Sequence, residues 1–226
     1  MKFEETDVWG FRHAFRGMRN PKNSWHLSDS YADRNPDAPI DFVIGAKDLI
    51  LAQTLIKGGS EHRKFLRQIF VSVDITAPLY WWKEFDTYKV GTTSNSCSTM
   101  HKLSSTPITL ECFEIDDFND EYVDGAEVIN FLSMLENLRQ KFNETKKKKY
   151  WKELIRWLPD SWLQKRTITM DYENIYSMIR QRQNHKLNEW SGRDDAAFQN
   201  FISWAHTLPY ADELLFYGLE NQNEAA

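Results

Sequence analysis

Residues 86–102, DTYKVGTTSNSCSTMHK, gather serine and threonine hydroxyls together with Asn95, Cys97 and His101. Hydroxyls and backbone amides of the run TTSNSCS are suited to holding a phosphate group. The alternative is a loop whose small polar side chains hydrogen-bond to its own backbone, which is common for serine and threonine clusters. The composition of this stretch therefore predicts either one wall of a pocket for a polar ligand or a self-bonded turn.

The segment APLYWWKEF, just before this stretch, supplies aromatic rings and a cation. Trp81 and Trp82 can stack on a planar ring, although adjacent tryptophans are also typical of one core residue and one rim residue. Lys83 precedes the stretch and Lys89 lies within it. Together with Arg182, far along the chain, these lysines are candidate partners for an anion.

Arg182 belongs to a predicted helix whose buried face changes character along its length. In YENIYSMIRQRQNHKLNEW, residues 172–190, the apolar stripe runs through Ile175 and Ile179. Its continuation leads to Arg182, then to His185 or Lys186, and then to Glu189. A buried face that becomes ionic needs a partner or a cavity, because an unpaired buried charge is unfavourable. The end of this helix therefore either faces a ligand or is a solvated surface end.

Nucleophilic and metal chemistry have weaker support. Cys97 and His101 would share one face of a helix, as a thiolate and the imidazole that activates it do. The alternative, which we favour, is a small, inert, buried thiol. The six histidines include no His-x-His or His-x-x-x-His pair, so we predict no metal site.

The composition favours a globular protein of a reducing compartment. Of 226 residues, 41% are apolar, which is enough for a core. Two cysteines are too few for a disulfide scaffold, and no apolar run reaches the roughly 18 residues of a membrane span. A net charge of −5 disfavours general binding to nucleic acid, and the run Lys146 to Lys149 is either a solvated connector or a nucleic-acid contact. We expect a cytoplasmic protein with no membrane partner.

Helices are predicted to position the first of these residues. Residues 46–57 carry apolar side chains nearly all round, which predicts a helix buried on most faces and ended by the glycines at 58 and 59. Ser60 is expected to cap a short helix over residues 61–66. Pro78 suits the first turn of another helix, LYWWKEF.

Periodicity predicts the remaining elements. Residues 68–75, QIFVSVDI, alternate as a strand does. The apolar stripe of residues 127–142 predicts an amphipathic helix, and Asp171 can cap the helix that follows it. Further helices are expected over residues 150–158, 172–190, 195–208 and 210–219, and residues 104–125 look like a long acidic excursion.

The order of these elements resembles the flavin-dependent thymidylate synthases, and the first shared block is a turn. The sequence GGSEHRKF is similar to the family's Gly-x-Thr-Ser-Pro-Phe-Glu-His turn, with Ser60, Glu61 and His62 in the matching places. The likeness spans roughly residues 10–190. With the segment RGMRNPKNSW included, the overall pattern also resembles that of phage-borne relatives of the synthase.

Two further blocks carry the resemblance. The family has Arg-His-Arg, seven residues and then Ser; here Tyr88-Lys89-Val90, seven residues and Ser98 occupy that frame, with Asn95 and Ser98 identical. The sequence from LPDSW to NEW is similar to the family's Leu-Pro start and its long helix. In that helix, Arg182 matches the arginine of the family's Leu-Arg pair.

The resemblance implies an architecture and a set of site residues. It implies an α+β fold, helix-rich with a small antiparallel or mixed sheet, in one domain over residues 1–226 that assembles as a homotetramer. FAD would be bound by Ser60, Glu61, His62, Lys89 and Asn95. A pyrimidine nucleotide would be bound by Lys83, Tyr88, Ser96, Ser98, His101, Arg182 and His185. Arg182 and Ser98 would hold the catalytic positions.

The resemblance also implies an activity. In the family, reduced flavin passes on reducing equivalents while a one-carbon unit moves from methylenetetrahydrofolate to the uracil ring of dUMP, and the cofactors do the difficult chemistry. NADPH is the further cofactor that the resemblance implies. The chain would then be an enzyme of the thymidylate synthase-like class.

Departures from the family pattern favour a second hypothesis. Where the family has two arginines and a histidine, Lys89 is the nearby cation, and a lysine lacks the bidentate fork of an arginine. Ser96 stands where the family has glutamate, Met100 where it has arginine, and His101 where it has tyrosine. The alternative is a non-catalytic protein of this fold that binds a nucleotide or a host protein.

Overall fold

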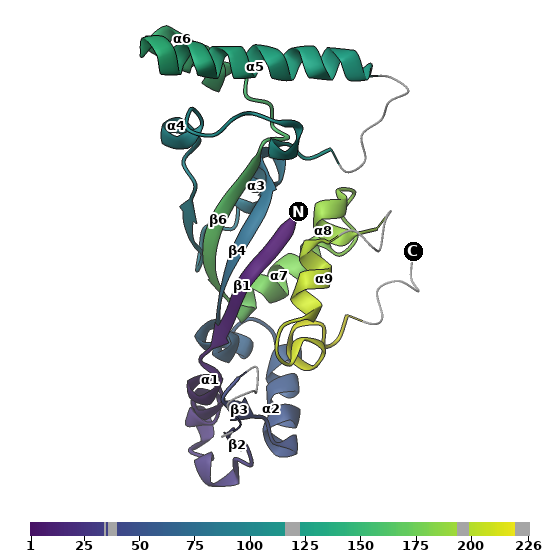
Figure 1. The fold of residues 1–226 in the computed structure, drawn as a ribbon. Coiled ribbons are helices and arrows are strands. Elements are labelled where there is room, and N and C mark those ends of the chain that lie inside the picture. Colours follow the sequence, from purple (N-terminus) through teal and green to yellow (C-terminus); the bar gives the residue numbers. More distant parts are fainter. Residues whose placement is uncertain (34, 36–39, 116–122, 194–198, 220–226) are drawn as a thin grey trace. The chain divides into compact units, whose positions relative to one another are not determined.

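The chain divides into two units, each described by itself below. The computed structural model describes residues 1–33, 35, 40–115, 123–193 and 199–219 (Figure 1). The larger unit holds residues 2–74, 88–94 and 167–226, and the smaller unit holds residues 1, 75–87 and 95–166. The expectation of a single domain over residues 1–226 stays a prediction.

Four strands from distant parts of the sequence form one sheet. Its strands lie in the order β1 (Lys2–Trp9), β4 (Phe70–Pro78), β6 (Leu163–Asp171) and β5 (Thr93–Ser96). The predicted strand at 68–75 is confirmed as β4, and it extends further, to Pro78. Val71, Val73 and Ile75 are buried while Phe70 is exposed, so the period of two predicted from the sequence is real.

The larger unit contains helices and a small second sheet. Strands β2 (Tyr31–Ala32) and β3 (Phe42–Val43) pair antiparallel. The helices are α1 (Phe11–Met18), α2 (Ala46–Lys57), α7 (Tyr172–Arg182), α8 (Asn188–Ser191) and α9 (Phe201–His206). Shorter helical segments are Asn20–Lys22, Trp25–Leu27, Arg63–Gln68 and the π-helical Ala211–Leu215. The core of this unit includes Phe15, Leu66, Tyr172, Trp190 and Phe201.

Helix α7 begins where the sequence predicts and ends earlier. Asp171 and Asn174 form a capping box, in which the Asp171 side chain accepts from the Asn174 N–H at 2.9 Å. The predicted helix over 172–190 is wrong in its second half, because α7 ends at Arg182. Beyond it, His185 Nδ1 accepts the Leu187 N–H at 3.2 Å, and Ser191 donates to the His185 carbonyl at 2.6 Å. These local side-chain bonds replace helical ones.

Two expectations for the region around α2 are wrong. Helix α2 is not buried nearly all round, because Ile50 is 65% exposed and the buried positions are Asp48, Ala52 and Ile56. Ser60 does not cap the next segment either. That segment is a 3-10 helix whose N-cap is His62, and it has no side-chain cap.

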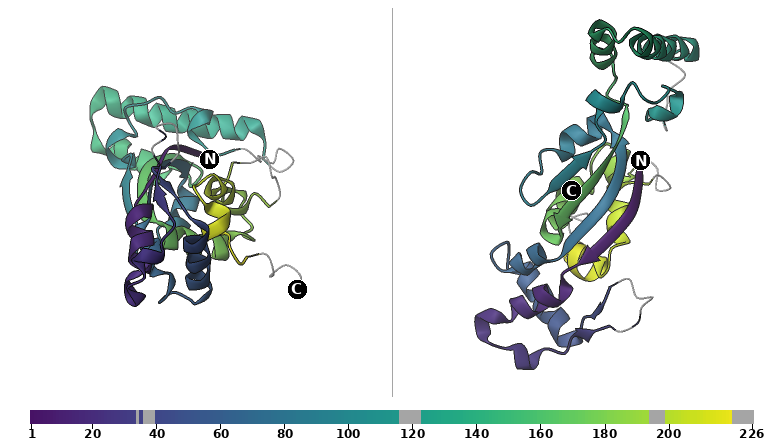
Figure 2. Two further views of the ribbon diagram at one scale, coloured as in Figure 1. Left: turned by 90° about the horizontal axis from the view of Figure 1, so that it is seen from below. Right: turned by 60° about the vertical axis from the view of Figure 1, so that its left-hand side comes forward.

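The smaller unit is built around an antiparallel pair of helices. Helix α5 (Gly125–Thr145) lies beside α6 (Lys148–Arg156), as Figures 1 and 2 show. Shorter elements are α3 (Leu79–Phe85), α4 (Thr99–Lys102) and the 3-10 turn Leu110–Cys112. The core cluster consists of Leu103, Ile108, Phe113, Leu135 and Leu154. The stripe predicted for α5 is confirmed, since Leu135 is fully buried and Phe131, Leu132 and Leu138 pack against the cluster.

One ionic network fastens the predicted acidic excursion to α5. Glu136 accepts the Ile108 N–H at 2.9 Å, and Arg139 donates to Glu136 and to the Ser104 carbonyl. The hydrogen bonds from Arg139 are the largest reason that the pKa of Glu136 is lowered to about 2. The start of the excursion is therefore fixed to the helix, and its residues 116–122 lie outside the described residues.

The last predicted helices are shorter than expected. The helix predicted over 195–208 appears as α9, Phe201–His206, with residues 195–198 outside the described part of the chain. The helix predicted over 210–219 is the short π-helical segment Ala211–Leu215. The fold class is nonetheless the predicted one, a helix-rich α+β architecture with a small sheet.

Candidate functional site

The segment 88–91 is bound to α7 at two places in the larger unit. Toward the start of α7, the side-chain amide of Asn174 donates to the Val90 carbonyl at 2.8 Å. Toward the end of α7, the Tyr88 hydroxyl donates to Gln181, also at 2.8 Å. The segment that matches the family's Arg-His-Arg frame therefore lies alongside the helix that carries the predicted anion-binding arginine.

Gly91 is the residue that allows this close approach. Its φ is +79°, and an added Cβ would lie 2.7 Å from Asn174 Oδ1 and 3.1 Å from Asp171 Oδ2. We expect Gly91→Ala to lower the free energy of unfolding by roughly 1–3 kcal/mol, because it combines a strained backbone with a clash against the capping box. Urea unfolding followed by circular dichroism measures the change.

Gly125→Ala is the matched control for this prediction. Gly125 is the first residue of α5, and a Cβ there would meet nothing within 4 Å. The control should unfold at the wild-type denaturant concentration or slightly above it. Equal unfolding midpoints for the two variants would show that segment 88–91 does not depend on the glycine.

The guanidinium of Arg182 packs beside two aromatic rings, which also contact each other at 6.3 Å between centres. Its Cζ lies 4.9 Å from the centre of the Trp190 ring and 5.6 Å from the centre of the Tyr88 ring. Its Nε donates to the Tyr88 hydroxyl at 2.9 Å. Such contacts fix the plane of a planar fork whose geometry matches phosphate and carboxylate. We call Tyr88, Gln181, Arg182, His185 and Trp190 the Arg182 cluster.

A column of packed rings supports the cluster from below. Trp190 is fully buried, and its ring meets Phe201 edge-on at 5.3 Å between centres. Phe201 packs on Trp204 at 5.4 Å, and Trp204 stacks on Phe3 of β1 at 5.0 Å. The Trp190–Phe201 pair is edge-on and the Phe3–Trp204 pair is stacked, which are arrangements that aromatic rings prefer, and the Phe201–Trp204 pair between them is tilted at 53°. The Trp190 ring, against which Arg182 packs, is therefore held in place by these neighbouring rings, which favours a fixed position for the Arg182 guanidinium.

Trp190 and Gln181 are the members of the cluster that the sequence did not single out. The sequence predicts that the segment KLNEW continues the long helix, and it assigns no role to Trp190 at the end of that segment. A signal was present, since a large aromatic residue closing an ionic stretch is unusual on a solvated helix end. Of the two hypotheses for the end of this helix, the surface end with solvated charges is wrong for Glu189, which is buried, whereas Lys186 is exposed.

The turn expected to bind the cofactor is in the same unit, and the 3-10 helix that follows it contacts the first turn of α7. Ser60, Glu61 and His62 are exposed, and the 3-10 helix after them carries Arg63 and Arg67, which both pair with Glu173. Glu173 and Arg182 are about 13 Å apart along the helix axis, at 1.5 Å per residue. The segment after the turn thus contacts the start of α7, whereas the Arg182 cluster lies at the end of that helix.

The other predicted site residues divide between the two units. Lys89 is exposed in the larger unit, next to Tyr88. In the smaller unit, Lys83 pairs with Asp160, Asn95 and Ser96 are exposed on β5, and Ser98 accepts the His101 N–H at 3.1 Å as the N-cap of α4. Residues 88–94 and Arg182 share a unit, whereas residues 95–98 belong to the other one. One pocket walled by residues 88–98 and Arg182 therefore stays a prediction.

Two hypotheses from the sequence are corrected by burial. Trp81 and Trp82 are both fully buried, so neither stacks on a ligand and neither is a rim residue. Trp82 donates to the Gln164 carbonyl at 2.9 Å, and the Arg166 guanidinium covers its ring at 4.2 Å. Cys97, expected to be buried, is exposed. Its backbone N–H bonds to the Lys165 carbonyl at 2.9 Å, because it extends the pairing of β5 with β6.

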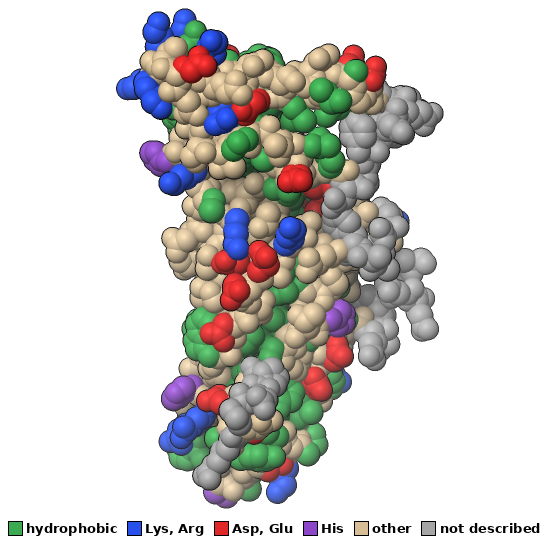
Figure 3. Space-filling view, in the orientation of Figure 1, with side chains coloured by type: hydrophobic (Ala, Val, Ile, Leu, Met, Phe, Trp, Pro, Cys, Tyr) green, Lys and Arg blue, Asp and Glu red, His purple; other side chains and the backbone are tan. Residues whose placement is uncertain are grey.

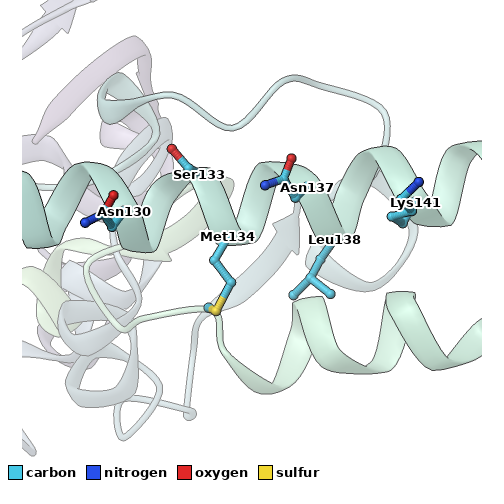
Figure 4. A pocket seen from close by; sticks show the side chains of 6 residues that line it. All are labelled: Asn130, Ser133, Met134, Asn137, Leu138 and Lys141. Atoms are coloured by element: carbon cyan, nitrogen blue, oxygen red, sulfur yellow. The ribbon is translucent and has the colours of Figure 1, made fainter.

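Other candidate sites have little support in the described residues. A hollow of about 360 Å³ along α5 is lined by Asn130, Ser133, Met134, Asn137, Leu138 and Lys141 (Figure 4). Its one charged residue, Lys141, already pairs with Glu144 at 3.1 Å. Basic side chains gather over α6, where the run from Lys146 to Lys149 is exposed (Figure 3).

The part of the chain that the structure describes contains neither a candidate metal site nor a candidate membrane span. No group of three or more histidine, cysteine, aspartate or glutamate side chains there could hold a metal ion. Likewise, no described helix is both long and apolar enough to cross a bilayer.

The fold is similar to that of known enzymes, although the sequence alone does not show it. No protein-family model and no curated protein matches the sequence. The chain is similar to the flavin-dependent thymidylate synthase ThyX from Helicobacter pylori complexed with FAD and dUMP, with 16% identity over 96% of this chain and 98% of that one and a TM-score of 0.65. A second structure of ThyX from Helicobacter pylori with FAD and dUMP gives 17% identity, 94% and 97% coverage and a TM-score of 0.62. The chain thus has a thymidylate synthase-like fold.

Proposed function

We propose that this chain binds a pyrimidine deoxynucleotide, dUMP or a close relative, at the Arg182 cluster. The observation that carries the proposal is the half-buried guanidinium of Arg182, which packs against the Trp190 and Tyr88 rings and is oriented by its hydrogen bond to the Tyr88 hydroxyl. A cation fixed in this way suits a phosphate, because little side-chain freedom is lost on binding. The likeness in fold to two structures that contain dUMP supports the same reading.

The neighbouring side chains have proposed roles in holding the nucleotide. The Tyr88 hydroxyl accepts from Arg182 Nε, and its proposed role is to orient the guanidinium that binds the phosphate. His185 packs edge-on against Trp190 at 6.4 Å, next to the arginine. Lys89 adds an exposed positive charge from the adjoining segment. From the smaller unit, Lys83, Ser96, Ser98 and His101 are proposed substrate contacts, with Ser98 and Arg182 at the catalytic positions.

The exposed turn Ser60–His62 is proposed to help bind FAD. It offers a hydroxyl, a carboxylate and an imidazole to solvent, and a Cβ added at Gly59 beside it would meet nothing within 4 Å. Lys89 and Asn95 are likewise exposed, so these side chains fit the role of partners for a bound dinucleotide. When bound, FAD would relay reducing equivalents from NADPH.

The proposed reaction is a reductive one-carbon transfer. One carbon passes from methylenetetrahydrofolate to the uracil ring of dUMP, two electrons and two protons come from NADPH and solvent, and tetrahydrofolate and NADP⁺ are left. The protein's part is to bind, orient and neutralise the phosphate, which places the ring. We propose that it acts as a homotetramer in the cytoplasm, the host cytoplasm if the chain is phage-borne.

A second candidate function is nucleotide or host-protein binding without catalysis. The observation that favours it is the segment 88–90, where Lys89 is the cation in place of the family's two arginines and histidine. Lys89 is exposed and carries a point charge, which binds a diphosphate less specifically than an arginine fork does. Purified protein that binds dUMP but takes up no flavin, as judged by its absorption spectrum, would support this candidate.

Calorimetric titration of dUMP tests the proposed site. We expect Arg182→Ala to weaken dUMP binding about ten- to a hundredfold, on the order of 1.5–3 kcal/mol, because a charged partner of the phosphate is lost. Arg182→Lys should recover part of the affinity, since the charge remains without the fork. Arg156→Ala is the control, because Arg156 is an exposed arginine that pairs with Glu153 on α6.

Two results would contradict the proposed site. If the wild type does not bind dUMP, with or without FAD, the nucleotide reading fails. If Arg182→Ala binds dUMP as tightly as Arg156→Ala does, the nucleotide lies elsewhere. Circular dichroism of both variants shows whether a loss of affinity reflects a loss of fold.

A further inference from the structure

A second hollow lies in the larger unit, between α1 and the segment that leads through β2 and β3. Its volume is about 280 Å³. The buried rings of Phe15 and Phe42 form an apolar floor, with their centres 5.7 Å apart. The segment RGMRNPKNSW, which the proposed function does not use, supplies one wall through Arg16, Arg19 and Trp25.

We propose that this hollow binds a planar aromatic ring that carries an anionic group, in a ligand about the size of a nucleoside monophosphate. None of its lining residues belongs to the Arg182 cluster or to the turn Ser60–His62. The proposal is therefore independent of the proposed function.

The positive charge of the hollow comes from two arginines on α1. Arg12 and Arg16 are one turn apart on the helix, so their side chains extend on the same side. Both are exposed, and within the described residues neither forms an ion pair with a carboxylate. Two adjacent arginines that have no counter-ion among the described residues attract an anion and can hold it in a bidentate manner.

The aromatic side chains that line the hollow and are exposed to solvent are Trp25 and Tyr31. Trp25 is 42% exposed and Tyr31 is 61% exposed, although both are large apolar side chains. The indole of Trp25 is oriented by a hydrogen bond from its Nε1 to Asn20 Oδ1 at 2.7 Å, and the Arg16 guanidinium lies 5.9 Å from its ring centre. Oriented aromatic rings exposed beside cations are suited to stacking on a ligand ring.

The carboxylate of Asp48, which bonds to three residues that line the hollow, does not oppose an anion. Asp48, under the floor, is fully buried and accepts from Arg19 Nε at 2.5 Å, and the Ser28 and Ser30 hydroxyls donate to its other oxygen. Arg19 thus neutralises Asp48, while the charges of Arg12 and Arg16 remain for a ligand. The volume is just below the roughly 300–1,000 Å³ of small-molecule sites, which favours one ring and one anionic group over a dinucleotide.

Calorimetric titration with simple probes tests this proposal. The probes are AMP and phenyl phosphate, which have a ring and an anion, benzoate as a carboxylate, adenosine without the anion, and inorganic phosphate without the ring. We expect AMP or phenyl phosphate to bind to the wild type at least tenfold more tightly than adenosine and inorganic phosphate do. Stronger binding of benzoate than of phenyl phosphate would identify the anion as a carboxylate.

Variants locate the binding and separate it from the Arg182 cluster. Arg12→Gln, Arg16→Gln and Trp25→Ala should each weaken binding of the best probe roughly tenfold, because each removes one direct contact. Arg156→Gln should leave that binding unchanged, and Arg182→Ala should retain the part of the binding that Arg16→Gln weakens. Arg12, Arg16 and Trp25 are exposed in the hollow, so circular dichroism of their variants should show a wild-type fold.

The proposal is overturned if no ring-bearing anion binds at millimolar concentration. It is also overturned if Arg12→Gln and Arg16→Gln bind as Arg156→Gln does, or if Arg182→Ala abolishes all binding. Failure of dUMP to bind at the Arg182 cluster, with probe binding still sensitive to Arg16, would remove the proposed function and leave this second site in place.

Discussion

Asp48→Asn is expected to lower the free energy of unfolding by about 3–5 kcal/mol, the loss typical of a buried ion pair that keeps one partner. Asp48 is fully buried on α2, and Arg19 at the end of α1 is only 5% exposed. An amide cannot neutralise the guanidinium, so the variant leaves a buried charge without compensation. The hydroxyls of Ser28 and Ser30 would also lose an ionised acceptor.

Urea unfolding at pH 7 measures this effect, and the chain offers a matched control. Asp160→Asn removes a carboxylate that also pairs with a cation, Lys83, but both partners are more than half exposed. The control should lose less than about 1 kcal/mol. The double variant Arg19→Met/Asp48→Leu should recover much of the stability that Asp48→Asn loses. Similar losses for Asp48→Asn and Asp160→Asn would show that the buried pair does not hold α1 to α2.

The same carboxylate predicts how stability responds to acid. Burial by itself raises the pKa of Asp48, but the hydrogen bonds from Ser28, Ser30 and Arg19 outweigh it and hold the pKa below its ordinary value of 3.8. A lowered pKa in the folded state gives stability that is fully present above the unfolded value and is lost as pH falls through the folded value. The wild type should therefore lose this contribution below about pH 3.8, and the difference between wild type and Asp48→Asn should shrink there.

Trp190→Ala is expected to have a comparable effect, a loss of about 3–5 kcal/mol in the free energy of unfolding. Trp190 is fully buried and contacts Phe201, Tyr88 and the Arg182 guanidinium. Removing the indole leaves a cavity and takes away the floor of the Arg182 cluster. Binding of dUMP should therefore weaken even where the variant is still folded.

Two further variants make the Trp190 prediction specific. Trp190→Phe keeps a ring under Arg182 and should retain more of both stability and dUMP affinity. Trp157→Ala removes a tryptophan that is 53% exposed on α6 and should change stability by less than about 1 kcal/mol. If Trp190→Ala is as stable as Trp157→Ala, the aromatic column does not support the cluster.

The sequence predicted correctly those elements whose own residues carry a clear periodic or capping pattern. Strand β4 alternates cleanly, α5 carries a continuous apolar stripe, and Asp171 has the side chain and spacing of a helix cap. Strands β1 and β6 were not predicted. The charged side chains of β1 are exposed, and β6 has four consecutive polar residues, 164–167, before Ile168, so neither strand alternates clearly; β6 is held in the sheet between β4 and β5. These two strands form because they pair with neighbouring strands of the sheet, although their own sequences do not alternate between apolar and polar residues.

The candidate site was predictable in part for similar reasons. The apolar stripe and the frame at 88–98 pointed to Arg182 and Tyr88, and the two side chains do meet although they are 94 residues apart. The contribution of Trp190 depends on the early end of α7, which brings the indole back beneath the arginine. That turn is stabilised by side-chain bonds of His185 and Ser191, which helical periodicity does not register.

Release of tritium from dUMP labelled at C5 of the uracil ring tests the proposed function most directly, because the incoming carbon replaces that hydrogen. The wild type, supplied with FAD, NADPH and methylenetetrahydrofolate, should release tritium only when all three are present. At dUMP concentrations well below saturation, Arg182→Ala should release it at least about tenfold more slowly, in step with its weaker binding. No release above background from wild-type protein that binds dUMP in the calorimeter would contradict one-carbon transfer and leave a nucleotide-binding protein on this fold.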